Sequence, residues 1–280
     1  MIDYKKFNDA MKAKDTLKGH FILKDENGNI LEEKDNLIVL RSRLFVLLHL
    51  FKPDDETRNE MEQSYIKNDR RRICLFKIGM GGADTQSAPF QPFVPKFTDR
   101  DLANPIPFVV TNSIKELDPE LDANPSVFLP DKHNFNKAKR EVYHWAEENA
   151  DDSVSYFAKT FDNIKFNFNT ESNEMYAELQ LTIENWDARG FFFNELGLLL
   201  AEEYYIKIDS DLNYLKDENG ELITISESEF KEEMAATKGA CEDNYIKQYK
   251  DMELFSRVTF GTKSLKTLNN KLIMEYRIYV

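Results

Sequence analysis

Two alternating runs around a short polar turn restrict the fold of this 280-residue chain more than any other feature. In the first run Ile164, Phe166 and Phe168 alternate with polar residues, and in residues 177–184 every second residue is again apolar. Successive side chains of a β-strand point to opposite faces, so a period of two predicts strands with one buried and one wet face. The polar residues 170–173 between the runs predict a hairpin.

Further segments also have the composition of strands. Asn27-Gly28 favours the positive φ angles of a tight turn, and it joins the first predicted hairpin. A second DENG sequence, residues 217–220, predicts another turn between strands. The predicted strands cover residues 19–24, 30–33, 73–78, 190–201 (apolar on both faces and therefore central), 204–208, 222–225, 254–260 and 271–280.

Two segments predict helices that pack against the strands. The apolar second half of residues 36–51 predicts a buried helix that ends at Pro53. Ser226 with Glu229 three residues later forms a capping-box pattern, and it predicts a helix over residues 227–250. We therefore expect an α+β fold that is mainly β, an antiparallel β-sandwich with two or three helices.

Eight of the nine prolines lie between residues 85 and 135, together with many aromatic and aliphatic residues. Prolines at this spacing interrupt helices and central strands, whereas the apolar content is too high for a free linker. We expect a long irregular arm at 85–150, between an N-terminal part at 1–84 and a C-terminal β core at 151–280. We predict that the arm contacts another subunit, with these interface candidates: Phe90, Phe93, Phe97, Ile106 and Phe108.

Composition excludes several classes of function. The net charge of -13 repels phosphate backbones and so disfavours binding to nucleic acids. We interpret the basic run Arg70–Arg72 as the solvated end of a helix. The longest apolar run, residues 44–51, is too short to cross a membrane, and the N-terminus lacks the apolar segment of a signal peptide. Cys74 and Cys241 are expected to be reduced packing residues.

No segment predicts a reaction centre. The cluster Gly79–Gly82 lacks the Lys and Ser or Thr of a phosphate loop, and we interpret it as a turn at a strand end. Residues 209–213 match only the first half of a calcium loop. We interpret Asp99, Arg100 and Asp101 as part of a solvated loop as well. The four histidines have no metal-binding or nucleophile spacing. We predict no catalytic, cofactor or metal residues, and a protein that is not an enzyme.

Several motifs together resemble components of phage tails and baseplates. The strand at residues 193–201 contains Asn-Glu-Leu-Gly-Leu, residues 254–260 read Leu-Phe-Ser-Arg-Val-Thr-Phe, and the last run ends Tyr-Arg-Ile-Tyr-Val. The first hairpin and the sequence Ile78-Gly-Met-Gly-Gly82 add to the resemblance, which covers about a third of the chain. The long proline-rich segment and the predicted helix at 227–250 depart from that pattern.

The resemblance implies a structural virion protein in the tail baseplate or tail-fibre attachment region, made in the host cytoplasm. Its expected partners are other virion proteins and copies of itself in a symmetric assembly. Two alternatives stay open, a neck or head-associated virion protein and a carbohydrate- or receptor-binding β-sandwich. For the second alternative Trp145 and Trp186 are the residues to examine.

Overall fold

The computed structural model describes residues 17–39, 42, 70–84, 91–111, 142–150, 154–169, 174–184, 187–188, 191–264 and 271–279. This part of the chain is mainly β, as predicted. Its strands are β1 (Lys18–Lys24), β2 (Ile30–Ile38), β3 (Arg72–Gly79), β4 (Pro105–Ile106), β5 (Val109–Thr111), β6 (Tyr143–Glu148), β7 (Val154–Thr160), β8 (Asn163–Asn169), β9 (Glu174–Ile183), β10 (Phe192–Lys207), β11 (Thr224–Ser226), β12 (Tyr245–Ser264) and β13 (Leu272–Tyr279). The helices that lie wholly within these ranges are α5 (Glu227–Thr237) and the 3-10 helix η2 (Glu242–Asn244).

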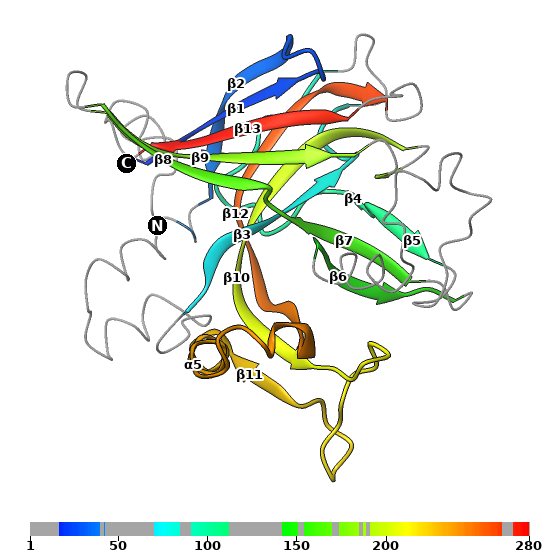
Figure 1. The fold of residues 1–280 in the computed structure, drawn as a ribbon. Coiled ribbons are helices and arrows are strands. Elements are labelled where there is room, and N and C mark those ends of the chain that lie inside the picture. Colours follow the sequence, from blue (N-terminus) through cyan, green and yellow to red (C-terminus); the bar gives the residue numbers. More distant parts are fainter. Residues whose placement is uncertain are drawn as a thin grey trace, which may run out of the picture.

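The described strands form one antiparallel sheet that curls, where a sandwich of two separate sheets was expected (Figure 1). Its strand order is β5-β7-β3-β10-β12-β2-β1-β13-β9-β8, with β4, β6 and β11 paired beside this path. Strand β2 links the two halves, since it pairs along β1 and its last residues, Leu37 and Ile38, pair with Arg257 and Ser256 of β12. Strands from all three predicted segments of the chain contribute to this sheet.

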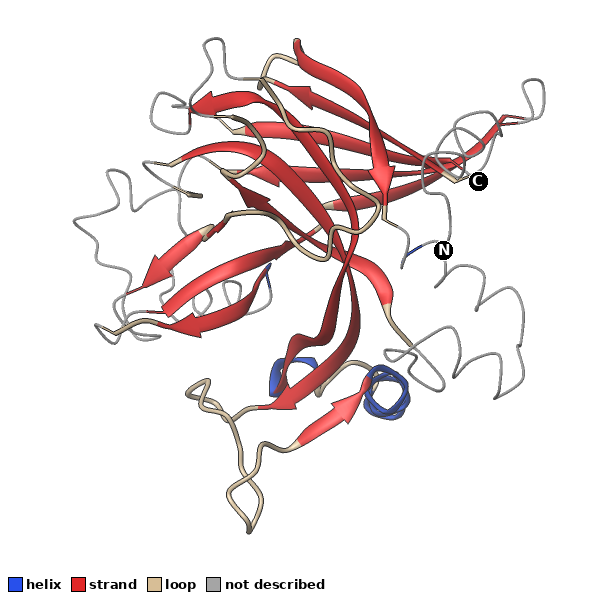
Figure 2. Ribbon diagram, turned by 180° about the vertical axis from the view of Figure 1, so that it is seen from behind, coloured by secondary structure: helices blue, strands red, loops and turns tan. Residues whose placement is uncertain are grey.

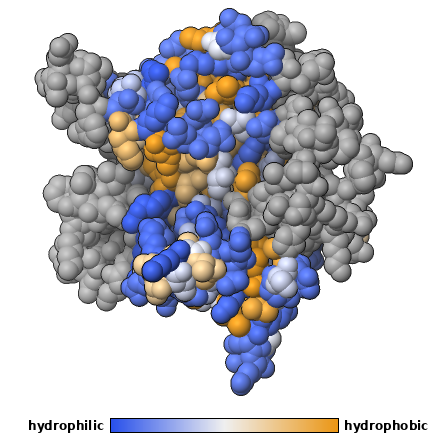
Figure 3. Space-filling model, viewed as in Figure 1, coloured by the Kyte–Doolittle hydropathy of each residue, from blue (hydrophilic) through white to orange (hydrophobic). Residues whose placement is uncertain are grey.

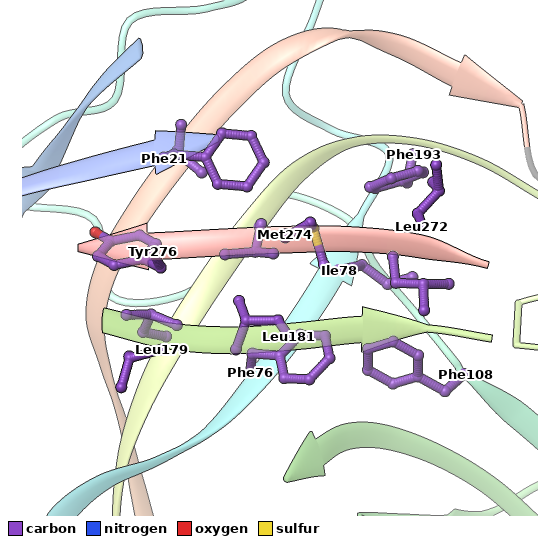
Figure 4. Packing of buried hydrophobic residues seen from close by; sticks show 14 of the residues in the cluster. Phe21, Phe76, Ile78, Phe108, Leu179, Leu181, Phe193, Leu272, Met274 and Tyr276 are labelled. Carbon is purple, nitrogen blue, oxygen red and sulfur yellow. The ribbon is translucent and has the colours of Figure 1, made fainter. Parts of the chain in front are cut away.

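The main hydrophobic core lies between the two halves of the curled sheet (Figure 4). Phe21 of β1 stacks on Phe260 of β12, with ring centroids 5.3 Å apart, and Phe193 of β10 meets Phe260 edge to face. Tyr276 of β13 is fully buried, and its hydroxyl donates to Ser256 Oγ at 2.9 Å. Because this hydroxyl has lost its hydration, burial raises the pKa of Tyr276.

Strands β10 and β12 continue beyond the curled sheet as a long two-stranded extension, paired as far as Lys207 and Tyr245 (Figures 1 and 2). Strand β11 pairs with the end of β10, and α5 packs on this extension. We call this extension, together with β11 and α5, the lower lobe. A small core of Tyr205, Cys241 and Tyr245, with Phe230 and Met234 of α5 against it, holds the lower lobe together.

The helix predicted at 227–250 starts where expected but is much shorter. Ser226 Oγ accepts from the Glu229 amide, and the Glu229 carboxylate accepts from the Ser226 amide at 2.8 Å, so the capping box is confirmed. The helix ends at Thr237, because Lys238 and Gly239 adopt left-handed φ angles of 53° and 84°. Strand β12 begins at Tyr245, so residues 245–250 of the predicted helix are strand. The predicted buried helix after residue 43 lies outside the described residues.

Candidate functional site

The motif residues that are far apart in the sequence meet at a buried carboxylate, Glu195 of β10. Glu195 Oε1 accepts from the backbone amides of Gly81 at 2.9 Å and Asn104 at 3.0 Å. Its Oε2 accepts from the Ala103 amide at 3.2 Å and from the Arg257 guanidinium, whose Nη2 lies at 2.6 Å. The side chain is fully buried, and both oxygens are occupied by donors of the protein itself.

Arg257 of β12 extends this cluster to the proline-rich segment. Its Nε and Nη2 donate to Glu195, while Nη1 donates to Asp99 Oδ2 at 2.8 Å. The cation is nearly buried and lies between two carboxylates, a geometry in which charge-assisted hydrogen bonds are strong. Residues 99–104 are thereby fastened to the outer face of β10 and β12, and we call this cluster of Glu195, Arg257 and Asp99 the latch.

A buried lysine lies beside the latch. Lys77 of β3 contacts the Asp101 carboxylate, and its ammonium lies 4.5 Å from the ring centroid of Trp145. Burial lowers the pKa of Lys77 from its usual 10.5 to about 7; Glu195 opposes this effect and the nearby positive charge of Arg257 adds to it. The loop around Asp99 and Asp101, interpreted as solvated from the sequence, therefore forms ion pairs with the sheet.

The glycine cluster after β3 is a close-packing device. A Cβ atom at Gly82 would lie 2.3 Å from the Asn194 carbonyl oxygen, and one at Gly81 would lie 2.8 Å from the Asn104 amide nitrogen. The Gly82 amide donates to Asn194 Oδ1 at 2.6 Å. These glycines are required because the backbone approaches β10 and residues 103–104 directly, which agrees with the predicted strand-end turn.

The structure divides the predicted interface residues into two groups. Ile106 and Phe108 are 3% and 1% exposed and belong to the main core, so they do not fit the predicted contact with another subunit. Ile106 pairs with Ile78, and the Phe108 ring packs against Phe76 at 5.2 Å. The prolines interrupt regular strands here, but they do not keep these side chains out of the core. Phe90 lies outside the described residues, and Phe97 is half-buried.

Phe93 and Val94 present apolar side chains to solvent, at 51% and 86% exposure. Their backbone is nevertheless fixed to the sheet. The Phe93 amide donates to the Gly82 carbonyl at 2.8 Å, the Phe93 carbonyl accepts from Thr259 Oγ1, and the Asp84 amide donates to Gln91 at 3.0 Å. This part of the arm is therefore a rigid loop with two outward apolar groups.

A second buried ion cluster, which no sequence pattern indicated, joins β7 to the loop before β10. Lys159 donates to the Asp187 carboxylate at 2.7 Å and to the Thr182 carbonyl at 2.9 Å. The Tyr143 hydroxyl donates to the other oxygen of Asp187 at 2.5 Å, and the Glu184 amide donates to Asp187 at 2.9 Å. All these charges are paired within the chain, so the cluster holds the strands in place.

The basic run and the acidic loop have structural explanations. Arg71 is buried and pairs with Glu253 at 2.6 Å, so the interpretation of residues 70–72 as wholly solvated is wrong for this residue. Asp209 Oδ1 accepts from the amides of Asp211 and Asn213, both at 2.9 Å. Asp25 and Asp217 close the two DENG turns in the same way, and these bonds lower the pKa of all three aspartates.

An open groove of about 730 Å³ lies between the lower lobe and the β7–β8 turn. Its lining includes five aromatic residues, two cations and three carboxylates, and half-buried Cys74. Burial raises the pKa of the Cys74 thiol to about 12, with Glu203 adding to the effect. Cys241 is a free, buried residue of the lower-lobe core.

The remaining observations concern metals, membranes and known proteins. Within the described ranges no group of three or more His, Cys, Asp or Glu side chains could hold a metal ion. No helix among the described residues has the length and apolarity needed to span a bilayer. No family model matches the chain, and neither the curated proteins nor the solved structures contain a match.

The site that the geometry defines is therefore the latch and the loop it holds. Glu195 and Arg257 belong to the motifs that the sequence singled out, but their pairing with Asp99 was missed. One signal could have found them. Residues 73–78 of β3, 192–201 of β10 and 254–260 of β12 are mostly apolar, and each stretch contains one charged residue, namely Lys77, Glu195 and Arg257. Isolated charges of opposite sign in central strands indicate a buried ion cluster.

Proposed function

We propose that this chain is a structural subunit of a phage virion, in the tail baseplate or tail-fibre attachment region, and that it acts by binding other proteins. The observation that carries the proposal is the loop at Phe93 and Val94, which is fastened to the sheet yet exposes two apolar side chains. A rigid loop loses little conformational entropy when a partner covers it, so its apolar area contributes to affinity at low cost.

The roles of the motif residues support this proposal. Asn194, Glu195 and Arg257 come from the segments that resemble tail and baseplate proteins. The side chain of each one forms hydrogen bonds to other residues of the chain. These contacts hold residues 81–82 and 99–104 in place, which suits a subunit that must present a fixed surface repeatedly in a symmetric assembly.

The exposed aromatic Phe93 is the residue that we expect to contribute most at the contact. Large aromatic side chains at the centre of an interface often supply most of its binding free energy. Val94 beside it, and Met80 on the neighbouring glycine loop, are also exposed apolar side chains. The contact would thus be built on the loop that Gly82 and Thr259 hold against the sheet.

Co-expression with the products of neighbouring genes tests the proposal. We expect the chain to purify in a stable complex with at least one tail or baseplate component. Phe93→Asp should abolish that complex, because it places a charge in the contact. Leu222→Asp serves as the control, since Leu222 is also exposed but lies on the lower lobe. A complex that forms equally well with Phe93→Asp, or none with any neighbouring product, contradicts the proposal.

A further inference from the structure

We propose that the groove beside the lower lobe is a carbohydrate-binding site. It lies where the β10–β12 extension, the first residues of β3 and the turn between β7 and β8 come together. Figure 3 shows apolar residues interrupting the otherwise hydrophilic surface between the upper sheet and the lower lobe. Its volume of about 730 Å³ lies within the range of small-molecule sites and would hold a mono- or disaccharide.

The aromatic part of the groove is held rigidly. Phe230 of α5 stacks on Tyr205 with ring centroids 3.7 Å apart, and it meets Tyr245 edge to face at 5.6 Å. The Tyr245 hydroxyl donates to Glu233 at 2.8 Å, and the Tyr205 hydroxyl donates to Glu203. The rings are thus fixed by both packing and hydrogen bonds. Phe230 is half-buried and Phe161 on the opposite side is half-buried as well, so both rings keep exposed surface.

Polar groups surround this aromatic surface. Asp162 and Asn163 lie on the β7–β8 turn, and Glu242 lies on η2 across the groove. All three residues are exposed, and their side chains make no hydrogen bond to another residue in the described part of the chain. Lys247 lies near the Glu203 carboxylate at 3.4 Å, and its side chain is about one third exposed. The groove therefore offers both acceptors and donors to a ligand.

This combination fits a hydroxyl-rich ligand best. Hydroxyl groups of a sugar both donate and accept, so they can use carboxylates, amides and ammonium groups at once. The C–H face of a sugar ring is apolar and slightly positive, and it packs on the negative face of an aromatic ring. A phosphate-bearing ligand would meet three carboxylates and only two cations, Arg72 and Lys247. A purely apolar ligand would leave these charges without water.

This inference is independent of the proposed function, since none of the groove residues belongs to the latch or to the loop at Phe93. Saturation-transfer NMR and calorimetry with the full chain test it. The probes are glucose, galactose and N-acetylglucosamine, with maltose, cellobiose, lactose and chitobiose. We expect at least one probe to bind with a dissociation constant of about 1 mM or tighter. No binding by any of these sugars overturns the proposal.

Variants of the rim locate the binding. Asn163→Ala and Glu242→Ala are exposed changes that leave the core intact, and each should weaken binding about tenfold through a lost hydrogen bond. Phe230→Ala should abolish it by removing the ring surface. Glu218→Ala and Phe166→Ala are matched controls outside the groove and should bind as the unchanged protein does. Binding that survives both rim variants at full strength overturns the proposal, because the sugar would then lie elsewhere.

Discussion

Arg257 and Glu195 form a two-pronged ion pair inside the protein, with Nε at 3.0 Å and Nη2 at 2.6 Å from the same carboxylate oxygen. Both side chains are buried, and the third nitrogen of Arg257 binds Asp99 of the proline-rich segment. The pair therefore connects β10 and β12 to a segment that the prolines prevent from joining the sheet as a long strand.

Glu195→Gln should destabilise the protein by about 3–5 kcal/mol. The amide keeps the size of the side chain, but it leaves the Arg257 charge buried with only Asp99 to balance it. Urea denaturation measures the loss. Glu227→Gln on the exposed face of α5 removes a surface ion pair with Lys231 and should change stability little. Equal losses of unfolding free energy for the two substitutions would show that the latch stabilises the fold no more than a surface ion pair does.

Gly82→Ala should lower the free energy of unfolding by about 1–3 kcal/mol, because the new methyl group would overlap the Asn194 carbonyl and force the glycine loop away from β10. Gly261→Ala is the matched control. At that position the nearest atom to a Cβ is Glu32 Oε2 at 3.7 Å, which is an ordinary contact. Thermal unfolding of both variants checks this prediction, and a Gly82→Ala protein as stable as the parent would contradict the close approach.

Lys77 should make stability rise with pH between about 7 and 10. The folded protein releases the Lys77 proton near pH 7, whereas the unfolded chain keeps it up to about pH 10, so unfolding takes up a proton in this window. The free energy of unfolding should gain up to about 3 kcal/mol between pH 7 and 9.5 relative to Lys77→Met. Parallel pH profiles for the two proteins would contradict a buried lysine with a lowered pKa.

Ser226→Ala should destabilise α5 by about 1 kcal/mol, since it removes the hydroxyl that accepts from the Glu229 amide. Amide hydrogen exchange across residues 227–237 reports the effect directly. Ser210→Ala, an exposed change in a loop, is the control. Unchanged exchange of the first helical turn would show that the cap is dispensable.

Local patterns predicted many of the strands, but not β4, β5 and β6 or the first residues of β12. The alternation at 164–183 is observed as β8 and β9, and the residues apolar on both faces form the centre of β10, between β3 and β12. The start of α5 followed from the capping box, but its end did not. The glycine of Lys238-Gly239 is a helix stop signal in the sequence, and β-forming residues follow it as strand β12 from Tyr245.

Long-range pairing could not be predicted from local patterns. Arg257 lies 62 residues from Glu195 and 158 residues from Asp99, and a period of two says which face a residue occupies but not which strand lies beside it. Phe108 illustrates the same limit. The proline-rich sequence around Phe108 suggests an exposed side chain, whereas the Phe108 ring packs against the rings of Phe76 and Tyr143 in the core.

The mass of the full chain in solution tests the central claim most directly, which is that a loop fixed to the sheet presents Phe93 at contacts between subunits. Light scattering should give a multiple of 32.8 kDa for the unchanged protein and a folded monomer for Phe93→Asp. A monomer for both proteins, with identical elution, or the same oligomer for both, would contradict the account.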